Sequence, residues 1–238
     1  RFSQTAVQRD LQLDALLVLN DFEALALSLP LLSAAQVRAH GAAPEARGTL
    51  AVIGPGTGLG VGGVVQTRDG WIALPGEGGH STLAASDDFE AELLRHLRQL
   101  FVHVSAERVL SGIGLPLLHD AVAALLGRTP ETLDAKAIVE RALARSDDIC
   151  ERTIDLFCGF LGGFAGNVAL TMGARGGVYI GGGIVPRLGD RFFVSSFRER
   201  FEAKGRFSDY LRAIPTAVIT DTLAALSGAA HAIDQYRA

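Results

Sequence analysis

The sequence predicts an α/β fold whose helices alternate with the strands of a mixed sheet. Residues 49–53 and 178–180 are short apolar runs of strand length, and a glycine-rich turn follows each of them. Residues 61–66 and 71–74 are also strand-like, and the Asp69-Gly70 turn signal between them predicts an antiparallel hairpin. The longer stretches between the runs have helical apolar spacing, so we expect parallel and antiparallel pairing in one protein.

The N-terminal part is predicted to contain two helices separated by a buried strand. Residues 3–11 have helical spacing, and residues 14–19 form an apolar run with the length of a strand. A second helix follows and ends at Pro30, because proline cannot continue the helical hydrogen bonds. Residues 41–48 contain two glycines and a proline, which favours a hinge or a domain boundary.

The central part is predicted to be mainly helical. Ser86 can cap a helix that continues to about residue 100, because acidic side chains fill its first turn. Further helices are expected at 115–126, 135–144 and 147–172, and four glycines in the last one indicate close packing of another backbone. The remaining elements are a strand at 178–180, a helix at about 190–201, a strand at 217–220 and a helix from residue 223.

Composition and charge limit the kinds of partner. The 238 residues suffice for one large domain or two smaller ones, and a net charge of −4 without basic clusters argues against a nucleic-acid partner. The apolar runs near the N-terminus are too short or too polar to cross a bilayer, and we expect no secretory leader. Cys150 and Cys158 would lie about 12 Å apart on one helix, too far for a disulfide, so a reduced, cytoplasmic protein is expected.

Residues 74–80, Leu-Pro-Gly-Glu-Gly-Gly-His, carry the strongest chemical signal. Glu77 can accept hydrogen bonds from two neighbouring hydroxyl groups, and the ring nitrogens of His80 can donate or accept. The glycines let the backbone approach a ligand closely, so the segment suits a polyol such as a sugar. The alternative is a glycine-rich turn with two solvated side chains.

Residues 54–60 form a second glycine-rich loop. Gly58, Gly60 and Gly63 match the spacing of a dinucleotide-binding motif, but that motif must open a helix, and here a hairpin is predicted. A glycine hairpin can still hold a phosphate through its backbone N–H groups, and Thr57 would add a hydroxyl donor. The alternative is that the glycines serve turn geometry only.

Other candidate positions have equally ordinary explanations. The dipeptide Asn20-Asp21 follows the predicted strand and could be a site or a helix cap, and Glu107 could be an exposed helical residue. Residues 181–183, Gly-Gly-Gly, could form a turn or let a base or ribose lie against bare backbone. The other histidines are scattered, so no zinc site is predicted, and no nucleophile-elbow serine is present.

Taken in order, six segments resemble the bacterial ATP-dependent glucokinase family of the hexokinase, actin and heat-shock ATPase superfamily. They are residues 19–22, 54–60, 74–80, 105–112, 182–187 and 201–207. The resemblance implies the two-lobed sugar-kinase fold, which is ribonuclease H-like, as in the actin-like ATPases. It implies a remnant of the small lobe at 1–40, the large lobe at 41–216, and a return to the small lobe at 217–238.

The resemblance also implies the roles of individual residues, with glucose, ATP and Mg²⁺ as ligands and a homodimer as an assembly of the family. Asp21 would be the catalytic base that takes the proton of the sugar's 6-hydroxyl. The remaining hydroxyls would be held by Asn20, Glu77, His80 and Glu107. Gly56, Thr57 and Gly58 would form a phosphate loop, and Gly182 and Gly183 would flank adenosine.

Two departures from the family pattern affect these expectations. The first phosphate loop of the family, of the type Asp-x-Gly-Gly-Thr, does not occur in the sequence, which starts with Arg1. We therefore expect an incomplete small lobe in a fragment or processed form that could be inactive alone, with few sheet partners for residues 15–19. Residues 221–226 replace an Asp-Asn-Pro-Gly-Leu-Leu-like turn, so the geometry of the last helix stays open.

Several alternatives remain open at this point. One is a non-catalytic sugar-binding or regulatory module. A nicotinamide oxidoreductase would rest on the three spaced glycines alone. The related family of repressors and sugar kinases carries a Cys-rich zinc motif that this sequence lacks. The residues also do not exclude mannose, fructose or glucosamine as the sugar, or polyphosphate as the donor.

Overall fold

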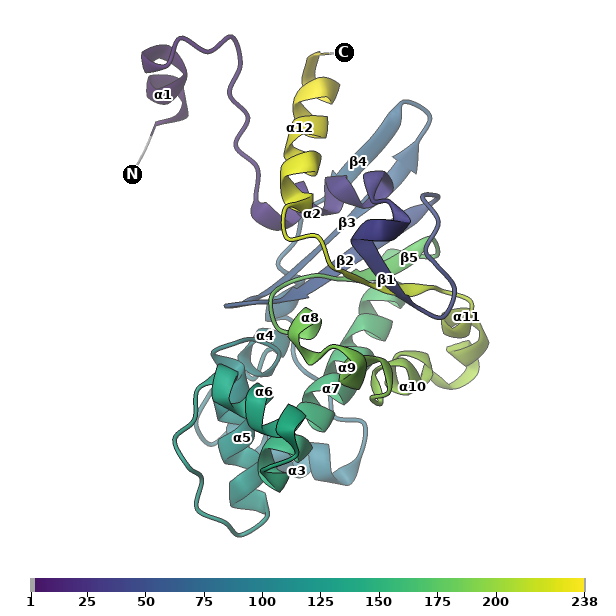
Figure 1. The fold of residues 1–238 in the computed structure, drawn as a ribbon. Helices are drawn as coiled ribbons and strands as arrows, with labels where there is room; N and C mark the ends of the chain where they lie inside the picture. Colours follow the sequence, from purple (N-terminus) through teal and green to yellow (C-terminus); the bar gives the residue numbers. More distant parts are fainter. Residues whose placement is uncertain (1–2, 238) are drawn as a thin grey trace.

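The computed structural model describes residues 3–237 and contains one six-stranded mixed sheet with the order β1-β6-β5-β2-β3-β4 (Figure 1). β5 pairs in parallel with β2 and β6, and the other pairs are antiparallel. The strands are β1 (Val37–His40), β2 (Thr49–Pro55), β3 (Leu59–Thr67), β4 (Gly70–Leu74), β5 (Gly177–Ile180) and β6 (Thr216–Ile219). The predicted α/β class and the β3–β4 hairpin are confirmed.

Helices cover both faces of this sheet. α2 (Asp21–Ser28) and α12 (Ala224–Arg237) pack against each other on one side, and a larger group of helices fills the other side (Figure 1). That group comprises α3 (Asp88–Leu97), α4 (Ala106–Val109), α5 (Gly114–Leu125), α6 (Ala135–Ala144), α7 (Asp148–Met172), α8 (Val185–Leu188), α9 (Asp190–Phe193), α10 (Phe197–Glu202) and α11 (Ser208–Arg212). α1 (Gln4–Asp10) lies apart from this body (Figure 1).

β2 is central because both of its faces are buried. Ala51 and Ile53 belong to the core on the α7 side, whereas Leu50 and Val52 belong to the core beneath α2 and α12. All four side chains are fully buried, as the alternation of side chains across a strand requires when both faces are covered. The glycine loop that ends β2 is therefore carried by one of the most tightly enclosed strands of the protein.

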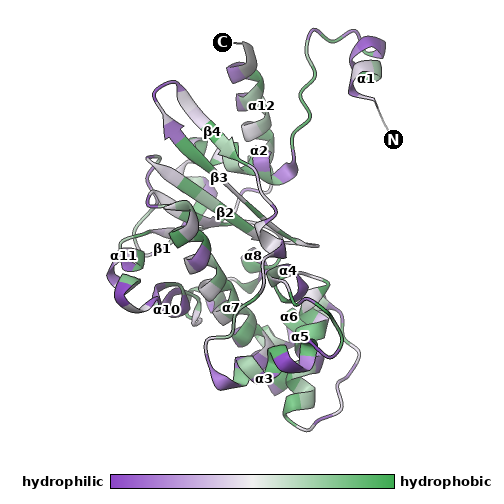
Figure 2. Ribbon diagram, turned by 180° about the vertical axis from the view of Figure 1, so that it is seen from behind, coloured by the Kyte–Doolittle hydropathy of each residue, from purple (hydrophilic) through white to green (hydrophobic). Residues whose placement is uncertain are grey.

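The strand expected at residues 14–19 is wrong. These residues form an extended segment without a partner strand in the described part of the chain, and Val18 is 55% exposed. Figure 2 shows that the segment is hydrophobic, and both ribbon views show it leaving the body with α1 at its far end. An apolar run becomes a strand only where a neighbouring strand can pair with its backbone groups.

Three further expectations need smaller corrections. β1 was not predicted, because the sequence Val-Arg-Ala-His has no apolar run, yet it pairs with β6. Asp87, not Ser86, caps α3, since its Oδ1 accepts a hydrogen bond from the Glu90 amide at 2.8 Å. The helix expected at 190–201 is broken into α9 and α10, because the Ser195 hydroxyl bonds back to the carbonyl of Phe192.

α7 is the central helix of the larger core. By length and composition it could cross a membrane, but 78% of its most apolar window is buried within the protein. Both cysteines lie on it, buried and unpaired, and burial raises the pKa of each thiol to about 12. Two of its four glycines, Gly162 and Gly166, meet another backbone as predicted: a Cβ atom on Gly166 would lie 2.6 Å from the carbonyl oxygen of Phe201 on α10. Within residues 3–237 the other two, Gly159 and Gly163, meet no backbone of another element.

Two adjacent glycines of α7 provide a matched stability test. A Cβ atom on Gly162 would overlap the carbonyl oxygen of Phe197, whereas the nearest atom to one on Gly163 lies 4.0 Å away. We expect Gly162→Ala to destabilise the protein by about 1–3 kcal/mol through overpacking. Gly163→Ala should stabilise it by about 0.5–1 kcal/mol, because alanine favours a helix interior. Urea unfolding of both variants measures the difference, and equal effects would contradict close α7–α10 packing.

Candidate active site

Two pockets meet at the N-terminus of α2. The first, here called the hairpin pocket, has a volume of about 390 Å³ and is lined by the β2–β3 turn, Glu77 and Glu107. The second, here called the glycine pocket, has a volume of about 500 Å³ and is lined by residues 181–183 and 219–222. Both pockets are lined by Asp21, Phe22 and Gly182. A carboxylate therefore lies at the junction of two spaces that can each hold a small molecule.

Asn20 is the N-cap of α2. Its Oδ1 accepts hydrogen bonds from the amides of Phe22 at 2.8 Å and Glu23 at 3.3 Å, which satisfies two free N–H groups of the helix start. The capping interpretation of this residue is thus correct, but it uses only the oxygen of the side-chain amide. The NH₂ group remains able to donate toward the hairpin pocket, which Asn20 also lines.

Phe22 fixes α2 against the β2–β3 hairpin. Cβ atoms on Gly54 or Gly60 would overlap the Phe22 ring, and one on Gly62 would lie 3.1 Å from the Phe22 carbonyl oxygen. These glycines therefore do more than permit a turn, because their bare backbone forms the surface on which the aromatic ring lies. No sequence pattern indicates this role for Phe22, which holds the neighbouring Asp21 beside the hairpin.

The turn of residues 56–58 is held at both ends. The Gly56 amide donates to the Gly58 carbonyl at 2.9 Å, and the Gly56 carbonyl accepts from Gly112 at 2.7 Å. β3 then runs as a strand to Thr67, so the helix required by a dinucleotide-binding loop is absent from this position, which overturns the oxidoreductase alternative. Gly56, Thr57 and Gly58 all line the hairpin pocket.

Glu107 connects the hairpin to the third polar segment. Its Oε2 accepts a hydrogen bond from the Leu59 amide at 2.9 Å, and a Cβ on Gly58 would lie 2.5 Å from the same oxygen. The other oxygen, Oε1, lies 3.9 Å from Nδ1 of His80. Glu107 is therefore oriented by the protein on one side and free to accept hydrogen bonds on the other.

Glu77, His80 and Glu107 form one cluster. Nε2 of His80 lies 4.0 Å from Oε2 of Glu77, so the imidazole stands between the two carboxylates. His80 stands beside the hairpin pocket, whereas both glutamates line it. The loop reaches this position because Gly79 packs against the carbonyl oxygen of Leu59, where a Cβ atom would overlap it. Two acceptors and an imidazole at this spacing suit a molecule with several adjacent hydroxyl groups.

The glycine pocket is formed where β5 ends. Gly182 has a φ of +76°, and a Cβ there would overlap the carbonyl oxygen of Pro55, so this position requires glycine. Gly183 faces open space, since nothing lies within 4 Å of its Cβ position. Arg187 also lines the pocket, and no role was predicted for it from the sequence.

Asp221 anchors the departing turn at the C-terminal end of this pocket. Its carboxylate accepts hydrogen bonds from the Leu223 amide at 2.8 Å and from Nε2 of Gln36 at 2.6 Å, and these bonds lower the pKa of Asp221. The turn that follows lets α12 pack on α2, where Gly228 meets the backbone of Ala24. The turn before the last helix, whose geometry the sequence did not determine, is therefore short and is held by Gln36, the residue that precedes β1.

The structure brings the predicted site residues together around Asp21. Those that line one of the two pockets are Asn20, Asp21, Gly56, Thr57, Gly58, Glu77, Glu107, Gly182 and Gly183. His80 contacts the cluster from the side at about 4 Å. Five of the six segments that resemble the glucokinase family contribute residues to this region. The sixth, residues 201–207, lies elsewhere.

Known proteins match the chain over nearly its whole length. A family model described as Glucokinase matches residues 1–236. A glucokinase from Aromatoleum aromaticum is 56% identical over 98% of the chain, and the chain spans 71% of that protein. A glucokinase from Neisseria meningitidis is 46% identical over 99% of the chain, and the chain spans 72% of that protein.

Solved structures agree with these relatives. The crystal structure of a glucokinase from an Antarctic psychrotroph superimposes with a TM-score of 0.90 at 40% identity, covering 96% of the chain and 71% of that protein. A ROK family glucokinase from Streptomyces griseus, solved in complex with glucose and AMPPNP, has a TM-score of 0.60 at 21% identity, over 96% of the chain and 70% of that protein. At that identity the likeness establishes a common fold.

Proposed function

The chain belongs to the glucokinase family, and from this premise we propose how its residues transfer a phosphoryl group from ATP to the 6-hydroxyl of glucose. The observation that carries the assignment of roles is the position of Asp21, which lines both pockets. Phosphoryl transfer requires an acceptor hydroxyl and a donor phosphate to meet in line, with little covalent help from the protein. A carboxylate at the junction can orient that hydroxyl and accept its proton.

The hairpin pocket is assigned to glucose. Glu77, His80 and Glu107 would hold the sugar hydroxyls, and the side-chain NH₂ of Asn20 would donate a further hydrogen bond. A sugar that leaves water must recover its hydrogen bonds, and the carboxylates and imidazole supply them. Since Glu107 also binds the Leu59 amide, this residue would couple the presence of sugar to the hairpin.

The glycine pocket and the hairpin turn are assigned to ATP. Gly56 would close the phosphate loop, Thr57 and Gly58 would donate backbone N–H groups to the phosphates, and Thr57 would add its hydroxyl. The adenosine would lie against Gly182 and Gly183. The exposed guanidinium of Arg187 stands on the same pocket and is a further candidate contact for the nucleotide.

The residues fit a magnesium ion that the nucleotide itself brings. Among residues 3–237 no group of three or more metal-ligating side chains is present, so a cage made of protein alone is not available in the described part. Mg²⁺ commonly binds through one or two carboxylates together with phosphates and water, and Asp21 is the carboxylate at the junction. Bound there, Mg²⁺ would neutralise charge on the phosphates.

We further propose the setting of the enzyme. Residues 1–40 and 217–238 would form one lobe, and residues 41–216 would form the other. The packing of α12 on α2 supports this division, whereas β6 crosses it because it pairs with both β1 and β5.

The two unpaired cysteines suit a reduced cytoplasm, where the product would enter glycolysis. A homodimer is the expected assembly of the family.

Glucose-dependent formation of ADP by the chain, with ATP and Mg²⁺, tests the proposal. Turnover with glucose, and much less with mannose, fructose or glucosamine, is the expected result, and replacement of ATP by polyphosphate should abolish it. Glucose binding without ADP formation would instead favour the sugar-binding module. Absence of both binding and turnover would contradict the assignment of the hairpin pocket.

A further inference from the structure

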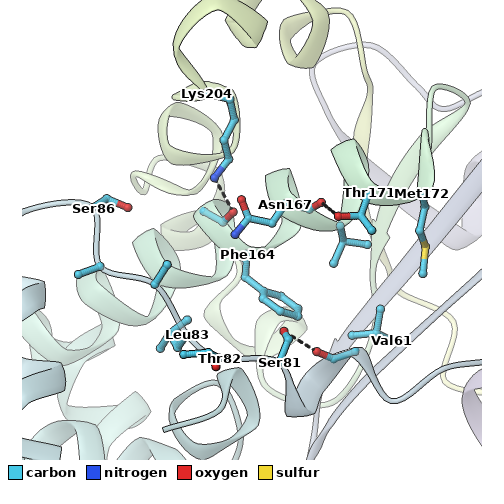
Figure 3. Close-up of a pocket in the computed structure, with 15 residues that line it drawn as sticks. Val61, Ser81, Thr82, Leu83, Ser86, Phe164, Asn167, Thr171, Met172 and Lys204 are labelled. Atoms are coloured by element: carbon cyan, nitrogen blue, oxygen red, sulfur yellow. Dashed lines mark hydrogen bonds between the residues drawn. The ribbon is translucent and has the colours of Figure 1, made fainter.

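A third cavity of about 340 Å³ lies outside the two pockets, between residues 81–86 and α7 (Figure 3). We call it the Lys204 cavity, after the only lysine that lines it. Its apolar lining includes Phe164 and Val168 from α7, and several hydroxyl and amide side chains line it as well. It also includes Lys204 of the segment 201–207, which the two-pocket site does not use.

The Lys204 side chain is held by two glycines of α7. Its stem crosses Gly166, where a Cβ atom would lie 2.7 Å from Cε, and its Nζ donates to the Gly163 carbonyl oxygen at 2.9 Å. An ammonium group has three N–H donors, and this bond uses one of them. Figure 3 shows the amino group at the cavity's edge with the Asn167 side chain beside it.

The positive charge of Lys204 is not balanced. Within residues 3–235, whose side chains the structure describes, no carboxylate lies within 4.0 Å of its Nζ. Burial, and then the charge of Arg200, lower the pKa of Lys204. The charge of Arg200 is offset by its own partners, Glu90 and Asp87, so Lys204 is the cation that remains for a ligand of the cavity. A cation in such surroundings favours an anion that enters from outside.

Hydroxyl groups and an amide complete the lining. Ser81, Thr82, Ser86 and Thr171 surround the space, and Asn167 lies between Lys204 and Thr171 on the α7 side (Figure 3). A lining of apolar, hydroxyl and amide side chains with one cation suits a small molecule with hydroxyls and a negative charge better than a purely hydrophobic one.

The cavity is also connected to the sugar cluster by hydrogen bonds. The Ser81 hydroxyl donates to the carbonyl of Gly78 at 2.8 Å, and the Ser81 carbonyl accepts from the Ala106 amide at 2.9 Å. Gly78 lies between Glu77 and His80 in sequence, and Ala106 precedes Glu107. Residue 81 therefore touches both segments that carry the carboxylates of the hairpin pocket.

We propose that the Lys204 cavity binds a small phosphorylated polyol and that its occupancy strengthens glucose binding. The phosphate would accept hydrogen bonds from Lys204 and Asn167, and a hydroxyl of the same molecule would pair with Ser81 or Ser86. A ligand that ties residues 81–86 to α7 would hold the Glu77–His80 loop in place before glucose arrives. Reciprocally, bound glucose must increase the affinity of the cavity for the phosphorylated polyol by the same factor.

Isothermal titration of the chain with glycerol 3-phosphate tests the site without any turnover. We expect binding that Lys204→Met and Asn167→Asp each weaken by about tenfold or more, through loss of one charge-assisted hydrogen bond or through repulsion. Lys204→Met keeps the stem on Gly166, and Asn167 is exposed, so both variants should fold. Arg206→Met removes an exposed charge from the same segment, outside the cavity lining, and should bind as the wild type does.

Saturating glucose should lower the dissociation constant of glycerol 3-phosphate about fivefold. No binding at millimolar concentration, or equal binding by Lys204→Met, would overturn the site. Equal affinity for inorganic phosphate would overturn the role of the hydroxyls, and an unchanged dissociation constant with glucose would overturn the coupling. Because each readout is an equilibrium constant, these outcomes do not depend on whether the chain turns over.

Discussion

Asp21→Asn is expected to lower kcat by about 10²–10⁴-fold while glucose affinity changes little. The amide keeps the size and the helix-start position of the carboxylate but cannot accept the proton of the attacking hydroxyl. In the proposed complex the sugar's other hydroxyls would contact Glu77, His80 and Glu107, which the substitution leaves in place. Steady-state kinetics with a coupled ADP assay give kcat, and equilibrium titration with glucose gives the affinity.

The fold should survive Asp21→Asn, because Asn20 caps α2 and because an asparagine oxygen at position 21 can still accept the hydrogen bond that Asp21 Oδ1 takes from the Phe22 amide. An unchanged melting temperature is therefore the control. Turnover close to that of the wild type would remove Asp21 from the role of base. A large loss of glucose affinity together with kcat would instead place Asp21 among the residues that hold the ground-state sugar.

Gly60→Ala is expected to reduce kcat by about 100-fold, because it forces the Phe22 ring away from the hairpin and displaces Asp21 with it. The substitution should also cost about 1–3 kcal/mol of unfolding free energy through overpacking. Gly60 also lines the hairpin pocket, but the atoms that its new methyl group would meet belong to the Phe22 ring, so the loss should appear mainly in kcat. The measurement combines kinetics with urea unfolding.

A second substitution separates positioning from general damage. Phe22→Leu shortens the side chain that meets the new methyl group, so the double variant should be more active than Gly60→Ala alone. The interaction between the two changes should amount to about 0.5–3 kcal/mol in the double-mutant cycle. Additive losses would contradict direct contact between Phe22 and Gly60 as the device that positions Asp21.

Much of the fold followed from local sequence signals. The β3–β4 hairpin and helices α6 and α7 are found within a residue or two of their expected bounds. Turn residues and apolar periodicity within these segments determine them. β1 was missed and residues 14–19 were mistaken for a strand, since pairing depends on neighbours that are distant in sequence. Local patterns do not contain that information.

The candidate site was identifiable only as separate pieces. Residue types at Glu77, His80 and Thr57 indicated hydroxyl and phosphate chemistry, and the family resemblance put the pieces in order. That Phe22 lies on glycines, or that the Asn20 oxygen is already used as a cap, depends on side-chain distances across the fold. The Lys204 cavity was not foreseeable, because its lining comes from four segments that no short motif connects.

The two pockets share Asp21, Phe22 and Gly182 but have otherwise different walls. In the proposed assignment the sugar and the adenosine would therefore occupy separate pockets, and only the phosphates of ATP would reach residues 56–58 in the hairpin pocket. With this arrangement, specificity for the sugar and specificity for the nucleotide would evolve separately. Substitutions at Glu77 would change the preferred sugar without changing the preferred nucleotide. Substitutions at Arg187 would change the preferred nucleotide without changing the preferred sugar. With separate pockets for sugar and adenosine, neither substrate would need the other to be bound first.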